Sequence, residues 1–213
     1  MTLNPTPALL ETLYWITLVA VIVSSASAVL IAGFKKFDLF GVIIIAMATG
    51  LGGGSLRDML LDRDVFWIAD QMFFIASLGS AFAMFLLARM VLISPRFFLI
   101  PDAAGLATFA VAGTLVSMMV GAPWLIASFM GVMTGTMGGI FRDVLSNTPP
   151  TVFQSPLYAT VSWAGSLFFI GLLQLNIDAT HSAIIAGLAI FIARLIAIYF
   201  NISLPRFRFK GEK

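Results

Sequence analysis

The sequence predicts an all-α integral membrane protein with seven transmembrane helices. Three observations lead to this fold class: an apolar composition, seven apolar stretches of spanning length, and a strong bias of basic residues toward one side. Hydrophobic residues make up 60% of the 213 residues and charged residues 10%, whereas a soluble domain is about half apolar and about a quarter charged. The chain has too few charges to solvate its own surface, so lipid is its expected solvent.

The same composition excludes several classes of function. The absence of cysteine excludes disulfides, thiolate metal sites and cysteine nucleophiles, and the single histidine, His181, excludes a histidine metal cluster. The twelve Lys and Arg are too scattered for a nucleic-acid surface. No nucleophile–base pair is evident. We therefore expect neither an enzyme nor a bound cofactor or metal.

Each of the seven apolar stretches is long enough to cross a bilayer as a helix. Glycine and small residues interrupt the second, third and fifth stretches, so their ends are uncertain. The first stretch carries no basic leader and is expected to remain as a span. The stretches are residues 12–33, 39–56 (or to 61), 71–88, 99–120, 124–141 (or to 145), 157–175 and 182–200.

The basic residues predict the orientation. With the N-terminus outside and the C-terminus cytoplasmic, nine Lys and Arg fall on the inner side, Arg57 and Arg63 fall outside, and Arg194 lies within the last span. The positive-inside rule favours this arrangement and an odd number of spans. It also predicts a multi-pass protein of the inner (plasma) membrane. The nine inner residues are Lys35, Lys36, Arg89, Arg96, Arg142, Arg206, Arg208, Lys210 and Lys213.

A segment of the second span recurs in the fifth. Residues 49–60 align with 134–145 at a shift of 85, and seven of the twelve positions are identical. The shift corresponds to three spans, an odd number, so the second copy crosses in the opposite direction. Inverted repeats are typical of transport proteins, with the site near the midplane. We expect one domain, 1–213: repeat one at about 9–92, repeat two at about 97–177, a seventh helix at about 181–201 and a basic tail at 202–213.

Paired glycines stand at matched positions of the two copies, Gly53-Gly54 and Gly138-Gly139. Adjacent glycines weaken a helix and leave its backbone open to ions or water. They also permit close packing of two helices. Both interpretations stay open. We favour a break or kink that opens a hydrated path.

An arginine–aspartate pair follows each pair of glycines: Arg57-Asp58 and Arg142-Asp143. Charges near lipid usually face a cavity or a partner. Neighbouring residues on a helix point about 100° apart, so we expect each arginine to pair with another helix. Thr49 and Thr134 either line the path or bond to their own helix.

The two Gly-Gly-x-x-Arg-Asp motifs, in inverted three-helix repeats with a seventh helix, resemble the prokaryotic branch of the trimeric intracellular cation (TRIC) channel family. That family also carries a glycine-transporter label. Lys-Lys-Phe-Asp-Leu-Phe-Gly at 35–41 and Asp-Ala-Ala-Gly-Leu-Ala-Thr-Phe-Ala-Val-Ala-Gly at 102–113 fit the resemblance. It implies a homotrimer with a water-filled path in each protomer that conducts monovalent cations, chiefly potassium. The implied path residues are Gly52, Gly53, Gly54, Arg57, Asp58, Gly138, Gly139, Arg142 and Asp143.

Two other functions remain as alternatives. A carrier for glycine or another small zwitterion would need one cationic and one anionic partner, and each Arg-Asp motif supplies both. A membrane enzyme or assembly factor is less favoured, because no catalytic constellation is evident.

The remaining charges have alternative interpretations. Asp62 and Asp64, in the acidic loop after the second span, form either an outer mouth that concentrates cations or an ordinary solvated loop. Asp102 is expected to interact with the dipole of the fourth span. Arg194 is expected to snorkel to the cytoplasmic interface or to pair with an acid such as Asp143.

Overall fold

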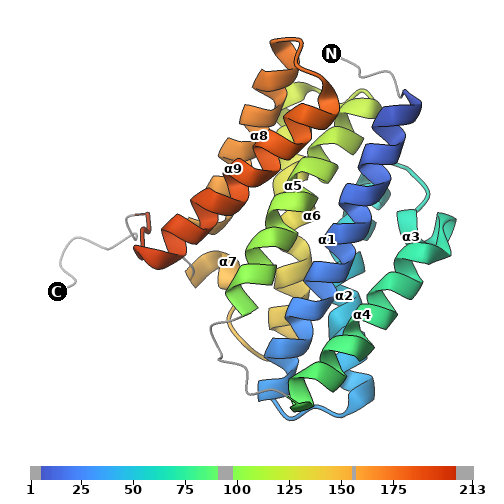
Figure 1. Cartoon of the computed structure of the whole chain (residues 1–213), viewed down its shortest axis with the longest axis vertical. Helices are drawn as coiled ribbons and strands as arrows, with labels where there is room; N and C mark the ends of the chain where they lie inside the picture. Colours follow the sequence, from blue (N-terminus) through green and yellow to red (C-terminus); the bar gives the residue numbers. More distant parts are fainter. Residues whose placement is uncertain (1–5, 91–97, 155–156, 205–213) are drawn as a thin grey trace.

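The computed structural model describes residues 6–90, 98–154 and 157–204. Within these ranges the chain forms nine helices and no strand (Figure 1). The helices are α1 (Pro7–Phe34), α2 (Leu39–Leu60), α3 (Phe66–Ala69), α4 (Gln71–Met90), α5 (Leu99–Met119), α6 (Trp124–Leu145), α7 (Thr151–Gln154), α8 (Tyr158–Gln174) and α9 (Ala179–Tyr199).

Six of these helices are long and apolar enough to cross a membrane: α1, α2, α4, α5, α6 and α9. The apolar helix α8, which corresponds to the predicted sixth span, has 17 residues, at the lower limit of about 17 for a span. The all-helical class predicted from composition is therefore confirmed. The seven-span count depends on α8.

The order of the helices repeats. Two long helices, a one-turn helix and a third long helix occur as α1–α4 and again as α5–α8, and α9 follows without a counterpart. The one-turn helices α3 and α7 begin at Phe66 and Thr151, 85 residues apart, which is the shift found in the sequence.

The ends of α2 and α6 are built alike. Asp62 and Asn147, 85 residues apart, both adopt a left-handed conformation with φ of 51°, which Asp and Asn tolerate better than most residues. The next backbone N–H donates to the carbonyl of Asp58 in α2, at 2.9 Å, and of Asp143 in α6, at 2.8 Å. This six-to-one bond closes each helix with the same C-terminal motif.

Helices α2 and α6 contact each other backbone to backbone through two glycines. A Cβ atom at Gly53 would overlap the carbonyl of Thr134, and one at Gly138 would overlap the carbonyl of Thr49. Each contact is the other shifted by 85 residues. Because the chain advances from 49 to 53 along α2 as it retreats from 138 to 134 along α6, these corresponding helices run antiparallel, as an inverted repeat requires.

The expected break at the paired glycines is wrong. Both α2 and α6 are continuous helices through Gly53-Gly54 and Gly138-Gly139. The physical reason is the close packing of α2 on α6, since any side chain at Gly53 or Gly138 would force the two backbones apart. A bend of the helix axis at these glycines stays a proposal.

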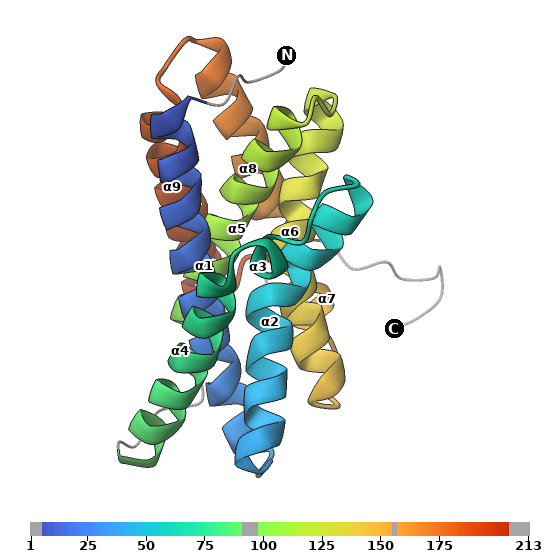
Figure 2. The same ribbon diagram turned by 90° about the vertical axis from the view of Figure 1, so that its right-hand side faces the viewer.

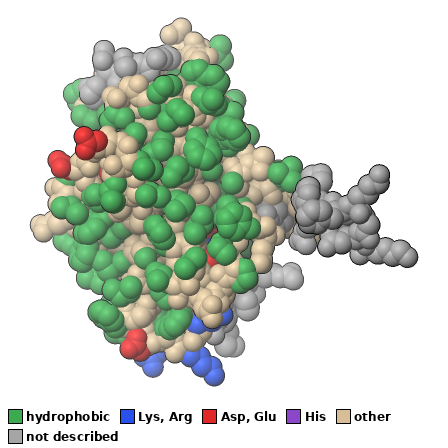
Figure 3. All heavy atoms as spheres, turned by 180° about the vertical axis from the view of Figure 1, so that it is seen from behind, with side chains coloured by type: hydrophobic (Ala, Val, Ile, Leu, Met, Phe, Trp, Pro, Cys, Tyr) green, Lys and Arg blue, Asp and Glu red, His purple; other side chains and the backbone are tan. Residues whose placement is uncertain are grey.

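Helix α5 occupies the centre of the bundle and packs against α1, α6, α8 and α9. Helix α4 lies at one edge and contacts α1, α2 and α3 and no other helix among the described residues (Figures 1 and 2). Large apolar side chains of α4, such as Phe82 and Leu87, are about half exposed. Figure 3 shows hydrophobic side chains over most of one face, with the visible Lys and Arg at one end. This is the surface expected of a bundle in lipid.

We predict that Gly138→Ala destabilises the protein by about 1–3 kcal/mol, because the added methyl group overlaps the Thr49 carbonyl and overpacks the α2–α6 contact. Gly171→Ala in α8 is the matched control. A Cβ there meets nothing within 4 Å, and alanine is the better helix former by about 1 kcal/mol. Thermal unfolding in detergent measures both. Equal unfolding temperatures for the two variants would contradict the packing role.

Candidate functional site

Arg142, in the last turn of α6, is the centre of a buried charged cluster. Its side chain is fully buried. Its Nε donates to Asp143 Oδ1 at 2.9 Å, and its Nη1 donates to Asp102 Oδ1 in α5 at 2.5 Å. The prediction that Arg142 pairs with another helix is confirmed. Asp102 stands in the first turn of α5, so it is near the helix dipole as expected, but its carboxylate is an ion-pair partner as well.

The same cluster holds the one-turn helix α7. The second carboxylate oxygen of Asp143 accepts a hydrogen bond from the backbone N–H of Thr151 at 2.6 Å, and Arg142 Nη2 lies 3.5 Å from the Thr151 hydroxyl. The guanidinium of Arg142 also lies 5.7 Å from the centre of the Phe98 ring. The carboxylate of Asp143 therefore has two roles: one oxygen neutralises Arg142, and the other accepts from the first backbone N–H of α7.

Arg194 brings α9 into this region. Its side chain is fully buried, and its guanidinium carbon lies 4.5 Å from the centre of the Tyr158 ring of α8, in cation–π geometry. The expectation that Arg194 snorkels to the interface is therefore wrong. The aromatic face of Tyr158 and the packing of α9 on α8 keep this arginine inside the bundle.

The pair in the first repeat, Arg57 and Asp58, has fewer partners. Arg57 is 2% exposed, and its Nε and Nη2 both lie 2.9 Å from Asp58 Oδ1. Asp58 Oδ2 accepts from the backbone N–H of Phe66, which begins α3, at 3.0 Å. The Phe66 ring lies 5.8 Å from the guanidinium. Among the described residues, Arg57 Nη1 has no hydrogen-bond partner.

The prediction that Arg57 finds an acidic or carbonyl partner on another helix is thus wrong. The Cα–Cβ bonds of neighbouring residues on a helix point about 100° apart. The long arginine side chain can nevertheless fold back onto the adjacent carboxylate. Its partner outside α2 is the aromatic ring of Phe66. Asp58 is buried, so it belongs to the charged pair and not to the solvated loop that follows.

Thr49 and Thr134, two other predicted site residues, bond within their own helices. The hydroxyls of Thr49 and Thr134 donate to carbonyls of their own helices, those of Ile45 at 2.6 Å and Met130 at 2.7 Å. This is the second of the two interpretations that the sequence left open. Neither hydroxyl is turned toward a partner helix by a hydrogen bond in the described structure.

Three other predicted glycines, Gly52, Gly54 and Gly139, lie against aromatic side chains. A Cβ at Gly52 would lie 2.5 Å from the Phe141 ring of α6, and one at Gly54 would lie 2.5 Å from the Phe66 ring of α3. A Cβ at Gly139 would lie 3.3 Å from the hydroxyl of Tyr158. These glycines make room for the aromatic side chains, and the Phe66 ring beside Gly54 also lies over the guanidinium of Arg57.

Asp62 and Asp64 lie apart from the buried pairs. Both are exposed in the loop between α2 and α3. Asp62 has a structural role there as well, because it supplies the left-handed residue that ends α2.

Sequence reasoning missed Phe66 and Thr151, which donate to the aspartates of the two pairs, and Tyr158, whose ring contacts Arg194. The signal was available for two of them. Phe66 and Thr151 stand at the same repeat shift of 85 and each follows its aspartate by eight residues. Applied beyond the twelve-residue motif, the shift identifies the two positions as equivalent, and the structure adds that their backbone N–H groups bond to the aspartates.

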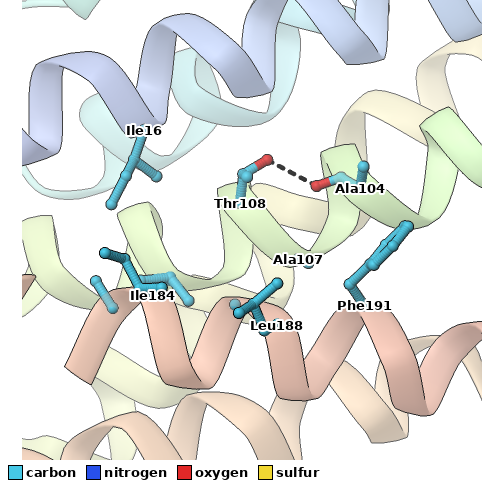
Figure 4. Close-up of a pocket in the computed structure, with 10 residues that line it drawn as sticks. Ile16, Ala104, Ala107, Thr108, Ile184, Leu188 and Phe191 are labelled. Carbon is cyan, nitrogen blue, oxygen red and sulfur yellow. Dashed lines mark hydrogen bonds between the residues drawn. The ribbon is translucent and has the colours of Figure 1, made fainter. Parts of the chain in front are cut away.

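An apolar groove of about 300 Å³ lies between α1, α5 and α9 (Figure 4). Its one polar side chain, Thr108, donates its hydroxyl to the carbonyl of Ala104 at 2.8 Å. The groove thus offers no polar group to an ion. None of the predicted site residues lines it: its lining residues are Ile16, Ala104, Ala107, Thr108, Val111, Ala183, Ile184, Gly187, Leu188 and Phe191.

Comparison with known proteins places this fold. A family model described as "Glycine transporter" matches the chain twice, at residues 14–89 and 99–174. The UPF0126 inner membrane protein YadS of Escherichia coli K12 is 34% identical over 197 residues, 91% of this chain and 95% of the relative. A UPF0126 membrane protein of Vibrio cholerae is 36% identical over 197 residues, 92% of this chain and 82% of the relative.

The solved structures are channels. A TRIC trimeric intracellular cation channel orthologue from Rhodobacter sphaeroides is 30% identical, with a TM-score of 0.85 over 89% of this chain and 98% of that one. This chain belongs to the TRIC family. A second TRIC cation channel structure is 26% identical, with a TM-score of 0.82 over 92% of this chain. The resemblance identified from the two motifs is confirmed, and the chain is a multi-pass membrane protein.

We predict that Asp102→Asn destabilises the TRIC fold of this chain by about 3 kcal/mol, because it removes one of the two carboxylates that neutralise the buried Arg142. Asp64→Asn, on the exposed loop, is the matched control and should change stability by less than about 0.5 kcal/mol. Thermal unfolding of the purified variants in detergent compares them. An Asp102→Asn protein as stable as the control would show that Asp143 alone neutralises Arg142.

Proposed function

We propose that this chain is a monovalent cation channel, chiefly for potassium, which works as a homotrimer with one hydrated path in each protomer. The observation that carries the proposal is the match of nearly the whole chain to a TRIC trimeric intracellular cation channel orthologue at 30% identity. The trimeric state and the cation conduction of that relative are extended here to this chain. No function as an enzyme is proposed, since the similar structures are channels.

The path is proposed to follow the line where α2 meets α6. The glycine contacts of Gly53 and Gly138 close this line at its middle. Arg57 and Arg142 lie four residues beyond them, about 6 Å along each helix, in opposite directions because the helices are antiparallel. Conduction would then require α2 and α6 to bend or separate at the glycines. The proposed lining is Thr49, Gly52, Gly53, Gly54, Arg57, Asp58, Thr134, Gly138, Gly139, Arg142 and Asp143.

The proposed topology has seven spans, with α8 as the sixth, the N-terminus outside and the C-terminus in the cytoplasm of a bacterial plasma membrane. Lys35 and Lys36 lie in the turn after α1 and Arg89 near the end of α4, the end of the bundle that positive-inside counting assigns to the cytoplasm. Arg96 and the basic residues of the tail, 206–213, lie outside the described residues. The division into repeats at about 9–92 and 97–177, with a seventh helix at about 181–201, belongs to the same proposal.

The alternative is a secondary carrier for glycine or another small zwitterion. The description of the matching family model favours it, and each arginine–aspartate pair holds one cationic and one anionic group. In both pairs, however, arginine and aspartate are bonded to each other. A zwitterion would have to compete with that bond, so the channel is the better supported function.

We predict that purified protein in liposomes passes potassium down its gradient at a rate that rises linearly with concentration, as a hydrated path does. A carrier would instead show saturable uptake of labelled glycine. Potassium flux and glycine uptake are measured in parallel on the same liposomes, with protein-free liposomes as the control. Saturable glycine uptake without potassium flux would overturn the channel proposal.

Asp62 and Asp64 are proposed as an outer mouth that concentrates cations. We predict that the double variant Asp62→Asn/Asp64→Asn lowers potassium current in dilute salt and not in molar salt, because screening shortens the reach of these charges from about 10 Å at 0.1 M to about 3 Å at 1 M. Asparagine suits position 62, since Asn147 holds the equivalent left-handed position.

Single-channel current of the double variant and wild type is compared from dilute to molar potassium. Equal currents throughout would show that the loop is only solvated. An equal proportional loss throughout would place these residues in a constriction instead of a mouth.

A further inference from the structure

The two repeats are matched closely enough to compare them position by position. In repeat one, a Cβ at Gly50 of α2 would lie 3.1 Å from the carbonyl of Val21 in α1. In repeat two, a Cβ at Gly135 of α6 would lie 3.0 Å from the carbonyl of Leu106 in α5. Gly50 and Gly135 are 85 residues apart, and so are Val21 and Leu106. Helix α1 therefore lies on α2 in the register in which α5 lies on α6.

This register places Thr17 of α1 where α5 has Asp102. Thr17 is buried. In repeat two, the carboxylate of Asp102 accepts from Nη1 of Arg142. In repeat one, threonine carries no charge, and Nη1 of Arg57 is left without an acceptor among the described residues. The backbone is repeated, and one anionic acceptor is missing.

We propose that Nη1 of Arg57 binds a small anion, whose acceptor atom stands where Asp102 Oδ1 stands in repeat two. Three observations support an anion. The Nη1 N–H groups are buried, a guanidinium cannot lose its charge, and a buried donor without an acceptor is costly. The repeat itself shows that an anionic oxygen fits on Nη1 of the equivalent arginine. The Nη1 atom is buried and the Phe66 ring lies 5.8 Å from the guanidinium carbon, which favours a chloride-sized or acetate-sized ion over a larger one.

The test measures the thermal stability of the full chain in detergent against anion concentration. Potassium chloride, potassium acetate and potassium gluconate are compared at equal ionic strength. Wild type should gain stability saturably with chloride or acetate and not with the bulkier gluconate, because a ligand that binds the folded state alone raises its stability. Stabilisation by chloride and not by acetate would indicate a site for a single-atom ion. Stabilisation by both would indicate a site that accepts a carboxylate. No saturable effect in wild type would overturn the proposal, since a water molecule on Nη1 would give none.

Exchange variants locate the site. Thr17→Asp supplies the missing carboxylate and should weaken anion binding at least about tenfold, as expected for loss of one charge-assisted hydrogen bond. Thr17→Val, of similar size and uncharged, should retain binding. An anion effect in Thr17→Asp equal to wild type would overturn the assignment.

Asp102→Thr tests the same idea from the other repeat. It frees Nη1 of Arg142 and should make the stability of repeat two newly dependent on the same anion. An anion dependence that does not rise in this variant would count against the proposal even if Thr17→Asp failed to fold. Binding is measured without transport, so this proposal and that of a cation channel can fail separately.

Discussion

The rest of this structure depends on the need to neutralise a buried guanidinium inside a bundle that lies in lipid. Both arginines are buried from solvent in this structure and a guanidinium cannot lose its charge, so the protein supplies the counter-charge itself. In both repeats the next residue does so. Each aspartate gives one oxygen to the arginine and the other to the first backbone N–H of the following one-turn helix. Each aspartate therefore pairs the charge and begins the next helix with its side chain, and it closes its own helix with its backbone carbonyl.

The spacing of the motif connects this charge to the contact between α2 and α6. Gly53 and Arg57, like Gly138 and Arg142, are four residues apart, so they share one face of their helix. On each helix, the face on which a glycine packs directly against the partner backbone carries the arginine side chain one turn later. Close helix contact and buried charge are consecutive parts of a single seam, and its two halves are related by the inverted repeat.

The hydrophobic pattern and the internal repeat were sufficient to predict the fold class, the positions of the long helices, the inversion and the family. They were not sufficient to predict the role of the glycines. Gly53-Gly54 is compatible with a helix break and with a packing surface, and only the facing carbonyl of Thr134 in the structure distinguishes the two. The partner of Arg57 was missed for a similar reason. Helix geometry gives the direction of Cα–Cβ, whereas a long side chain has enough torsions to return to Asp58. The repeat gave no indication of the role of Tyr158, because the equivalent position in repeat one is a different residue, Phe73.

The differences between the repeats gather on one side. Asp102, Tyr158 and Arg194 gather around Arg142 in repeat two. In repeat one, Thr17 stands at the position of Asp102 and Phe73 at that of Tyr158, and no helix corresponds to α9. Helix α9, which lies outside the repeat, packs on α5 and α8. It therefore brings the charge of Arg194 to the cluster around Arg142 and not to the pair around Arg57. A backbone that is nearly two-fold symmetric therefore carries an unsymmetrical set of charges. Since the field in a low-dielectric bundle is set by such fixed charges, an ion on the proposed path along the α2–α6 seam would meet a different environment at each end.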